Sequence, residues 1–430
     1  MPRVRSADRL GYKYCKACLP IRNLLSCGTA QLTKRTGALR RSHISSSTNL
    51  EGPAVLMQAN PLWPVEHRFP ALNENVRVDV AVVGGGIAGI SCGFHLQNAG
   101  YKVAVLEAEE VGSSATGASS GILYYGSGGN FVEATERYGY ENATTLWKET
   151  ERTIEDIESL IEKHRIQCGF RHTGAIMAAK NEQEEARIER ENAALASIGI
   201  RTERLTPDDI ERSFKGTRFQ AGLSFDVCAV IHPAQFTADL AKKFNLPVYE
   251  KSPMLTFSEE PERVTVRSSR AEVVCDRLIL ATNLQPILGL EKHFAEETTV
   301  VLASREMPDI QATWPERVVL WTMEEKYDIL YPLGNRLALE LYQAKRVKEK
   351  IAEYYTHVPF EIQYRWGDSW GKTADLLPIA GPLTQRVYAA VAMGDEGIVM
   401  GFAIGNRIKI VLEGGNDPLL TMTSPNRFGT

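Results

Sequence analysis

Three glycines and one glutamate carry the clearest chemical signal in this chain. Gly84, Gly86 and Gly89 follow the G-x-G-x-x-G spacing after a short apolar run, and Glu107 lies 18 residues beyond the last glycine. In this pattern the glycines allow a tight turn, a close approach of backbone to a pyrophosphate, and close packing of helix on strand. A carboxylate at Glu107 can accept hydrogen bonds from a ribose hydroxyl pair and would repel a 2′-phosphate. The spacing therefore predicts a site for NAD or FAD rather than NADP.

The elements predicted around these residues form a βαβ unit. Apolar residues over 78–83 predict a buried parallel strand that leads into the glycines. A helix follows and ends at Asn98-Ala99-Gly100, a glycine C-cap signal, and a second strand spans 102–106. This order of elements makes the prediction more specific than a glycine triplet alone. The alternative is a βαβ unit that binds no ligand.

Length and composition limit the possible classes of protein. The 430 residues can form two domains, and 43% apolar with 24% charged residues is ordinary for a globular protein. No run of 18 apolar residues occurs, so no transmembrane segment is predicted. Residues 1–50 hold ten Lys or Arg and one acid, which leaves 39 basic and 52 acidic residues elsewhere. An acidic body argues against nucleic acid as a partner.

The basic N-terminal segment, residues 1–56, is set apart from the predicted fold. It is rich in Arg and Ser and poor in acids, as a transit peptide is. A disordered tail and an upstream extension with the true start at Met57 are the alternatives. The predicted location is the mitochondrial matrix or another organelle if residues 1–50 are a transit peptide, and the cytoplasm otherwise. Cys15 and Cys18 lack a second ligand pair, so no metal site is predicted, and the dispersed cysteines are expected to be reduced.

Several motifs together resemble a known family. Residues 109–123, of which 114–121 read SATGASSG, are too polar for a strand, and by composition alone they would be a flexible loop. With the glycine motif and Glu107, this loop resembles the FAD-dependent D-amino-acid oxidase superfamily, which includes glycine, sarcosine and related amine oxidoreductases. Three further stretches carry the resemblance, which covers residues 77–415: a proline-led helix from Pro233 with a strand over 248–255, the segment 275–283, and residues 375–382 with 388–401.

The resemblance implies an α/β fold with a discontinuous Rossmann-type FAD-binding domain and a mixed-sheet α+β substrate domain. The FAD-binding domain is expected over 77–125, 225–290 and 372–415, and the substrate domain over 126–224 and 291–371. Periodicity predicts helices and strands in the substrate domain and a polar surface tail beyond Gly414. The predicted helices are 147–164, 182–198 and 343–355, and the predicted strands are 318–322, 327–331 and 336–342.

The family motifs also imply which residues contact FAD. The loop before a helix predicted over 398–412 should place N–H groups against the negative charge of the reduced ring. Met254 stands where the family contacts adenine through its backbone. The implied FAD contacts are Gly84, Gly86, Ile87, Ala88, Gly89, Glu107, Ala108, Ala115, Thr116, Ser119, Ser120, Gly121, Ile122, Met254, Ala281, Thr282, Gly394, Asp395, Gly397 and Ile398.

Two departures from the family pattern bear on the substrate and on the flavin linkage. Amino-acid-specific members carry an arginine that clamps a carboxylate where this chain has Trp370, and nothing in the sequence selects Arg365 or Arg305 as a substitute. Members with tethered FAD carry a histidine in the loop where this chain has Ala118 and Ser119, or a cysteine near Trp370. The resemblance therefore implies noncovalent FAD and a pocket suited to amines.

Aromatic side chains are predicted to line that pocket. Trp370, Tyr327 and Trp321 are the candidate substrate-pocket residues, and Tyr331 and Trp366 could extend an aromatic wall that holds a cationic amine by cation–π contact. The alternative is that these rings are core of the substrate domain. His95, His172 and His232 are expected to be structural, and Cys92 to be a core residue.

The predicted activity is oxidation of a C–N bond of an amine or amino acid to an imine by hydride transfer to the flavin. The electron acceptor is O2 or unknown, and desolvation of the amine makes a catalytic base optional. The alternative is a catalytically idle FAD-binding protein that serves in assembly or as a chaperone in an organelle. A tRNA-modifying flavoenzyme is a weaker alternative because the body of the chain is acidic.

Overall fold

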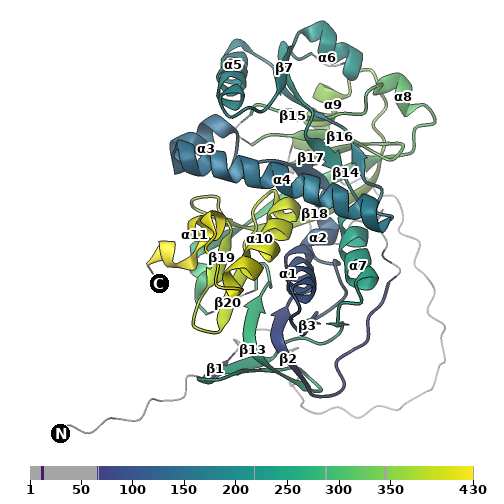
Figure 1. The fold of residues 1–430 in the computed structure, drawn as a ribbon. Coiled ribbons are helices and arrows are strands. Elements are labelled where there is room, and N and C mark those ends of the chain that lie inside the picture. Colours follow the sequence, from purple (N-terminus) through teal and green to yellow (C-terminus); the bar gives the residue numbers. More distant parts are fainter. Residues whose placement is uncertain are drawn as a thin grey trace, which may run out of the picture.

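The computed structural model describes residues 11–13, 65, 67–216, 218–285, 288–324, 326–342 and 346–429. Two large sheets, one in the lower and one in the upper half of the view, dominate the molecule (Figure 1). A small three-stranded sheet adds the antiparallel strands β4 (Ile122–Tyr124), β9 (Cys228–Val230) and β5 (Arg171–His172). One hydrophobic cluster contains Val82 and Ile90 as well as Tyr331 and Trp366, so the core is continuous between the two halves.

The first sheet has nine strands and a parallel centre. Its main order is β1-β11-β12-β13-β2-β3-β10, and β20, which pairs with β19, lies parallel to β13. Strands β13, β2, β3 and β10 are parallel, and β11 and β12 extend the sheet antiparallel. The strand bounds are β1 Gly11–Lys13, β2 Val76–Val83, β3 Val103–Leu106, β10 Val248–Tyr249, β11 Thr256–Glu259, β12 Val264–Arg267, β13 Glu272–Leu280, β19 Ile379–Pro382 and β20 Val387–Val391.

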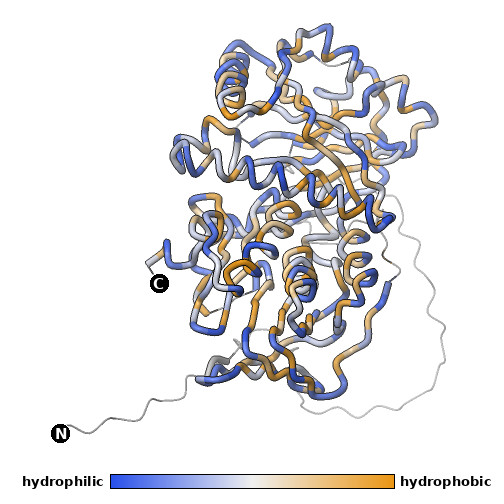
Figure 2. Tube along the Cα trace, in the orientation of Figure 1, coloured by the Kyte–Doolittle hydropathy of each residue, from blue (hydrophilic) through white to orange (hydrophobic). Residues whose placement is uncertain are grey.

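Helix α1 (Ile87–Asn98) packs against both α7 (Pro233–Lys243) and α10 (Gly397–Leu412) beside this sheet (Figure 1). The strands β2 and β3 are rich in Val and Ala and end fully buried, as expected for a parallel sheet covered on both faces. Figure 2 shows hydrophobic residues along these strands and along α10. Burial of this apolar surface is the main force that holds α1 and α10 on the sheet.

The second sheet has eight strands in the order β18-β14-β17-β16-β15-β6-β8-β7. Its neighbours are antiparallel except for the parallel pair β15 and β6. The strand bounds are β6 Ala175–Ala179, β7 Thr202–Leu205, β8 Ala221–Phe225, β14 Phe294–Ser304, β15 Val319–Thr322, β16 Ile329–Leu333, β17 Arg336–Leu341 and β18 Ile362–Thr373. The remaining helices are α2 Ala115–Ala118, α3 Phe131–Tyr138, α4 Tyr140–His164, α5 Glu182–Ser197, α6 Pro207–Ser213, α8 Ile310–Thr313, α9 Val347–Tyr354, α11 Pro418–Thr423, and the 3-10 turns η2 Leu290–His293 and η4 Pro425–Phe428.

The predicted fold class, an α/β protein with a Rossmann-type unit and a second mixed sheet, is confirmed. Among the predicted elements, 147–164 lies within α4, 182–198 matches α5, and the three substrate-domain strands match β15, β16 and β17. Part of the helix predicted over 343–355 falls outside the described residues, and the described part is α9. The domain boundaries stay a prediction.

Four expectations were wrong. The strand predicted over 248–255 is only β10, since it pairs with β3 for two residues. The loop read as too polar for a strand contains α2 and leads into β4. The expected surface tail beyond Gly414 forms α11 and η4, because Leu419 and Leu420 are apolar and buried and Asp417 caps α11 by accepting from Leu420 N. The N-terminal segment was set apart from the fold, yet Gly11–Lys13 pairs with β11; its other predicted features lie outside the described residues.

Candidate active site

A cavity of about 650 Å³ is bounded by residues of both large sheets. Strands β2, β13 and β20 run parallel, so the loops after Val83, Leu280 and Val391 reach the same edge of the first sheet. Ligands of open α/β sheets bind at this carboxyl edge. Strands β14, β15 and β18 of the second sheet supply the opposite wall.

The glycine turn after β2 brings the start of α1 to this edge. Gly84 has φ +115°, a conformation that favours glycine, and a Cβ there would collide with the carbonyl oxygen of Ala281. A Cβ at Gly89 would collide with the carbonyl oxygen of Gly84, so the third glycine fixes how closely α1 approaches the turn. Gly86 is the N-cap of α1, has no side-chain cap, and lines the cavity. The start of α1 therefore presents N–H groups and a favourable dipole to an anion.

Glu107, at the end of β3, is held close to this turn. Its two carboxylate oxygens accept hydrogen bonds from Gly85 N at 2.6 Å and from Glu109 N at 2.7 Å. Burial raises the pKa of Glu107, and these backbone hydrogen bonds oppose the rise. The carboxylate keeps further acceptor positions, because each oxygen can accept more than one hydrogen bond.

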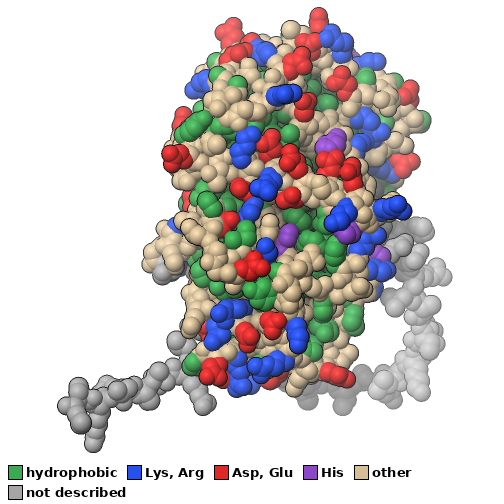
Figure 3. All heavy atoms as spheres, in the orientation of Figure 1, with side chains coloured by type: hydrophobic (Ala, Val, Ile, Leu, Met, Phe, Trp, Pro, Cys, Tyr) green, Lys and Arg blue, Asp and Glu red, His purple; other side chains and the backbone are tan. Residues whose placement is uncertain are grey.

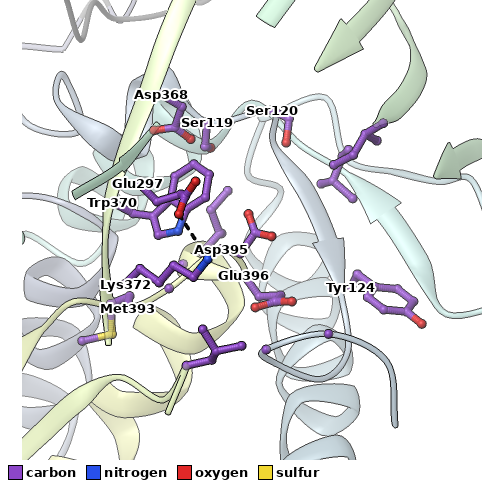
Figure 4. Close-up of a pocket in the computed structure, with 18 of the residues that line it drawn as sticks. Ser119, Ser120, Tyr124, Glu297, Asp368, Trp370, Lys372, Met393, Asp395 and Glu396 are labelled. Carbon is purple, nitrogen blue, oxygen red and sulfur yellow. Dashed lines mark hydrogen bonds and ion pairs between the residues drawn. The ribbon is translucent and has the colours of Figure 1, made fainter. Parts of the chain in front are cut away.

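Hydroxyl groups of the α2 segment form the next part of the wall. Thr116 Oγ1 accepts a hydrogen bond from Ile87 N at 3.0 Å, which ties α2 to the start of α1. Trp366 on β18 donates from Nε1 to the carbonyl of Ala118 at 2.8 Å, which ties α2 to the second sheet. Ser119 and Ser120 line the cavity next to these anchors (Figure 4).

The loop after β20 and the start of α10 line a further part of the cavity. Gly394 has φ +78°, and Glu396 is the N-cap of α10 without a side-chain cap of its own. The Asp395 carboxylate accepts hydrogen bonds from the hydroxyls of Tyr327 and Tyr342, the latter at 2.5 Å. Burial raises the pKa of Glu396 to about 7, and its Oε2 atom is buried without a hydrogen-bond partner. Asp395 is exposed at the open cavity, yet the surrounding protein displaces part of its hydration, and this desolvation, followed by repulsion from Glu396, raises its pKa.

The cavity wall contains most, but not all, of the predicted site residues. Those outside the wall include the two glycines that shape the turn, and Met254, which is buried in a separate core cluster. The predicted residues on the wall are Gly86, Ile87, Ala88, Ala115, Thr116, Ser119, Ser120, Ile122, Ala281, Trp321, Tyr327, Trp370, Gly394, Asp395, Gly397 and Ile398. Those outside it are Gly84, Gly89, Glu107, Ala108, Gly121, Met254 and Thr282. Their roles toward FAD stay predictions.

The aromatic wall is smaller than the sequence suggested. Trp370 lies edge-on to Tyr342 with ring centroids 5.9 Å apart, and Trp321 stacks on Phe225 at 5.7 Å. Tyr331 and Trp366, by contrast, are fully buried core residues and line no part of the cavity. Their inclusion in the wall was wrong, because strand alternation cannot tell a cavity face from a core face when both are apolar.

Neither suggested substitute for the missing arginine reaches the cavity. Arg305 is 72% exposed and pairs with Glu361, and Arg365 is not on the cavity wall. The arginines that do line it, Arg137 on α3 and Arg187 on α5, were missed. Nothing in the sequence of α3 and α5 indicates that side chains of both helices reach the cavity.

Ion pairs on the wall were also missed. Glu297 on β14 pairs with Lys326 at 3.0 Å and with Lys372 at 3.1 Å, and Figure 4 shows the Glu297–Lys372 pair beside Trp370. Arg187 pairs with Glu133 at 2.7 Å. Lys372 is the one of these that sequence could have found, since it lies two residues after Trp370 and therefore on the same face of a strand.

The histidines have surroundings of the kind expected for structural residues. His172 contacts Glu158 at 2.5 Å, and His232 caps α7 by accepting from Gln235 N at 3.1 Å. His95 is packed against the rings of Phe94 and Phe402, and burial lowers its pKa to about 3. Cys92 is fully buried in the main core cluster, as predicted.

Three features of the structure bear on membranes, metal ions and nucleic acids as partners. No helix in the described part of the chain is long and apolar enough to cross a membrane. The described residues contain no cluster of His, Cys, Asp and Glu that could hold a metal ion. On the face drawn in Figure 3, acidic and basic side chains are interspersed and do not gather into a basic patch.

Comparison with known proteins gives the family. The model for "FAD dependent oxidoreductase" (DAO) matches residues 79–409. The chain belongs to the DAO family. Gamma-glutamylputrescine oxidoreductase of Escherichia coli is 26% identical over 80% of this chain and 86% of that protein. A probable oxidoreductase, OrdL, of Haemophilus influenzae is 30% identical over 222 residues, so the chain spans about half the length of that relative.

Solved structures of DAO-like fold agree with the architecture. Glycine oxidase from Bacillus cereus superposes with a TM-score of 0.67 at 19% identity, over 80% of this chain and 98% of that one. L-proline dehydrogenase from P. horikoshii gives 0.68 at 17% identity, over 83% and 99%. These similarities establish the fold of this DAO-family chain, and the family membership identifies it as an FAD-dependent oxidoreductase.

Proposed function

We propose that this DAO-family protein oxidises a C–N bond of an amine or amino acid to an imine, with noncovalently bound FAD as the hydride acceptor. The observation that carries the proposal is a single cavity that joins the starts of α1 and α10 to Trp370, Trp321 and Tyr327 of the second sheet. In this arrangement one wall suits a dinucleotide and the facing wall suits a small organic substrate. The proposed division of the chain is an FAD-binding domain over 77–125, 225–290 and 372–415 and a substrate domain over 126–224 and 291–371.

The residues at the carboxyl edge of the first sheet fit FAD. The N-terminus of α1, whose N-cap residue is Gly86, suits the diphosphate. Glu107 suits the ribose hydroxyls. The N–H groups around Gly397 face the cavity at the start of a 16-residue helix, where they favour negative charge on the ring. The flavin ring supplies hydride acceptance when FAD is bound.

A noncovalent linkage is supported by the composition of the cavity wall. The described residues that line it include neither His nor Cys. The described cysteines, Cys92, Cys168, Cys228 and Cys275, are buried elsewhere, and burial raises the pKa of each thiol to about 12, which keeps it protonated. Denaturation in acid is expected to release all of the flavin into the supernatant, and flavin retained on the precipitated protein would contradict this part of the proposal.

An amine substrate is better supported than an α-amino acid. Trp370 stands where a carboxylate-binding arginine is expected, and the name of the Escherichia coli relative points to an amine. The names of the structural neighbours, glycine oxidase and L-proline dehydrogenase, keep amino acids within the proposal.

The test is an anaerobic absorbance scan of the FAD-loaded protein with amines and amino acids added singly. Bleaching of the flavin band near ~450 nm by one compound establishes the reductive half-reaction and the substrate class. An unchanged spectrum across the panel with FAD still bound would overturn the proposal in favour of the idle assembly or chaperone flavoprotein. A protein that binds no flavin would exclude both functions.

A further inference from the structure

Among the described residues, no cation pairs with the two neighbouring carboxylates at the cavity, Asp395 and Glu396. Three other acids on the wall do have cationic partners: Glu133 pairs with Arg187, Glu297 with two lysines, and Glu324 with Lys180 and Lys350. Within the described chain, no Lys, Arg or His side chain lies within 4.0 Å of the carboxylates of Asp395 or Glu396. Two neighbouring carboxylates repel each other, and a cation that binds between them relieves this repulsion.

The surroundings of Asp395 are built to hold its carboxylate in one orientation. The hydroxyls of Tyr327 and Tyr342 both donate to Oδ2, and the two rings meet edge to face with centroids 5.4 Å apart. Trp370 packs edge-on against Tyr342. In Figure 4 the Asp395 side chain lies between Trp370 and Glu396, within the cavity. Aromatic faces next to an oriented carboxylate form a site that favours an ammonium ion.

The remaining cavity acids do not offer the same site. Glu340 is buried and accepts a hydrogen bond from Thr299 at 2.8 Å, while burial and Glu340 keep the pKa of Asp368 well above its ordinary value. Both carboxylates are buried, with exposed fractions of 4% and 8%, so they present less surface to a ligand than Asp395 does. Glu396 lines the cavity beside Asp395, and hydrogen bonds from the Ser127 side chain and the Gly128 backbone partly oppose the rise in its pKa on burial.

We propose that Asp395, together with Glu396, binds a positively charged nitrogen of the substrate other than the one that is oxidised, and so selects a cationic amine over a compound that presents only a carboxylate. This inference rests on the proposed function and names the residues that set its substrate class. Asp395 is here a binding and specificity-determining residue, with no assigned role in the hydride transfer itself. Trp370, where an arginine would attract an anion, contributes an apolar face instead.

One arginine limits how far this selection extends. Arg137 lines the cavity, and its Nη1 donates to the carbonyl of Gly128 at 2.5 Å. A substrate with both charges could place its carboxylate near this guanidinium and its ammonium at Asp395. The test therefore compares ligands that carry only one charge.

The experiment uses binding and does not depend on turnover. Tetramethylammonium and pivalate, a cation and an anion of similar bulk, are titrated separately into the FAD-loaded protein, and the shift of the flavin spectrum is followed. Tetramethylammonium is expected to shift the spectrum with a measurable Kd and pivalate to bind at least about tenfold more weakly, because the carboxylates and the aromatic rings attract a cation and the carboxylates repel an anion. Stronger binding of pivalate would overturn the inference.

Variants assign the effect to the two carboxylates. Asp395→Asn is expected to weaken tetramethylammonium binding by about tenfold or more, and Glu396→Gln to weaken it as well. Glu136→Gln is the matched control, since it removes the same charge from an exposed residue of α3 outside the cavity wall and should leave Kd unchanged. If Asp395→Asn fails to retain FAD, Glu396→Gln decides the question.

The outcomes separate this inference from the proposed function. If an amine bleaches the flavin but the two carboxylate variants bind tetramethylammonium as tightly as the parent protein does, the subsite is wrong and the oxidation stands. If no amine bleaches the flavin yet tetramethylammonium binding depends on Asp395, the subsite stands and the oxidation is wrong.

Discussion

Replacement of Gly405 by alanine is expected to separate the two helices that frame the cavity. Gly405 lies on α10 at its closest approach to α1, where Ser91 Oγ donates to the carbonyl of Phe402 at 2.7 Å. A Cβ at Gly405 would collide with Ser91 Oγ and would lie 2.6 Å from the backbone nitrogen of Cys92. Backbone cannot move aside as a flexible side chain can, so α10 must shift.

Gly401, one turn earlier on α10, provides a graded comparison. A Cβ there would lie 3.0 Å from Ile87 Cγ2 and 3.3 Å from Ala88 N, contacts that small movements can relieve. Alanine in place of glycine stabilises a helix by up to about 1 kcal/mol, whereas overpacking a core costs about 1–3 kcal/mol. Gly401→Ala is therefore expected to be nearly neutral and Gly405→Ala to destabilise the protein by about 1–2 kcal/mol or more.

Urea unfolding followed by circular dichroism measures the stability of both variants, and the ratio of flavin to protein absorbance measures FAD retention. Because the starts of α1 and α10 both line the cavity, Gly405→Ala should lower FAD retention along with the unfolding midpoint. A Gly405→Ala protein as stable as the parent, or a Gly401→Ala protein that is the less stable of the two, would refute the packing argument.

Three further predictions concern the buried charges and the glycine turn. Lys350→Ala should destabilise the protein by about 3–5 kcal/mol in urea unfolding. The Lys350 amine lies 2.6 Å from the buried Asp328, which the substitution leaves without this cation. The double variant Lys350→Met/Asp328→Asn should recover most of the lost stability. Burial raises the pKa of Glu191 from 4.5 to about 7, so the folded state keeps a proton that the unfolded state loses; stability should fall as pH rises from 4.5 to about 7, and Glu191→Gln should flatten that slope in urea midpoints. Glu107→Ala should weaken FAD binding about tenfold or more in fluorescence titrations, and unchanged affinity would remove Glu107 from the ribose site.

Local signals were enough to predict the βαβ unit. The strand over 78–83, the glycine turn and the helix that follows depend on residues within about one helix length of each other, and they occur as β2 and α1. The predicted helix over 398–412 occurs as α10 for the same reason. Such elements follow from periodicity, turn chemistry and capping, all of which a short window of sequence contains.

The charged part of the cavity could not be predicted in this way. Glu297 and Trp370 are directly opposed in the pairing of β14 with β18, a register that no sequence motif specifies. That register puts Glu297 diagonal to Lys372, within reach of an ion pair. Arg137 and Arg187 could not be predicted as cavity residues for the same reason, because helices α3 and α5 approach the cavity only through tertiary packing. Arg365 and Arg305 were named as substitutes for the missing arginine from the sequence alone, and neither lines the cavity.

The arrangement of the two walls suggests why a substrate class can change on this fold without loss of the cofactor site. The first wall depends on backbone: glycines whose Cβ atoms would collide with carbonyl oxygens, and helix starts at the ends of parallel strands. The second wall depends on side chains of β14, β15 and β18, among them Trp370. Asp395 stands where these walls meet, on a loop of the first and bonded to tyrosines of the second. From the proposed subsite we expect a charge change at Asp395 to alter what the cavity binds and to leave the backbone of the glycine turn after β2 unaltered.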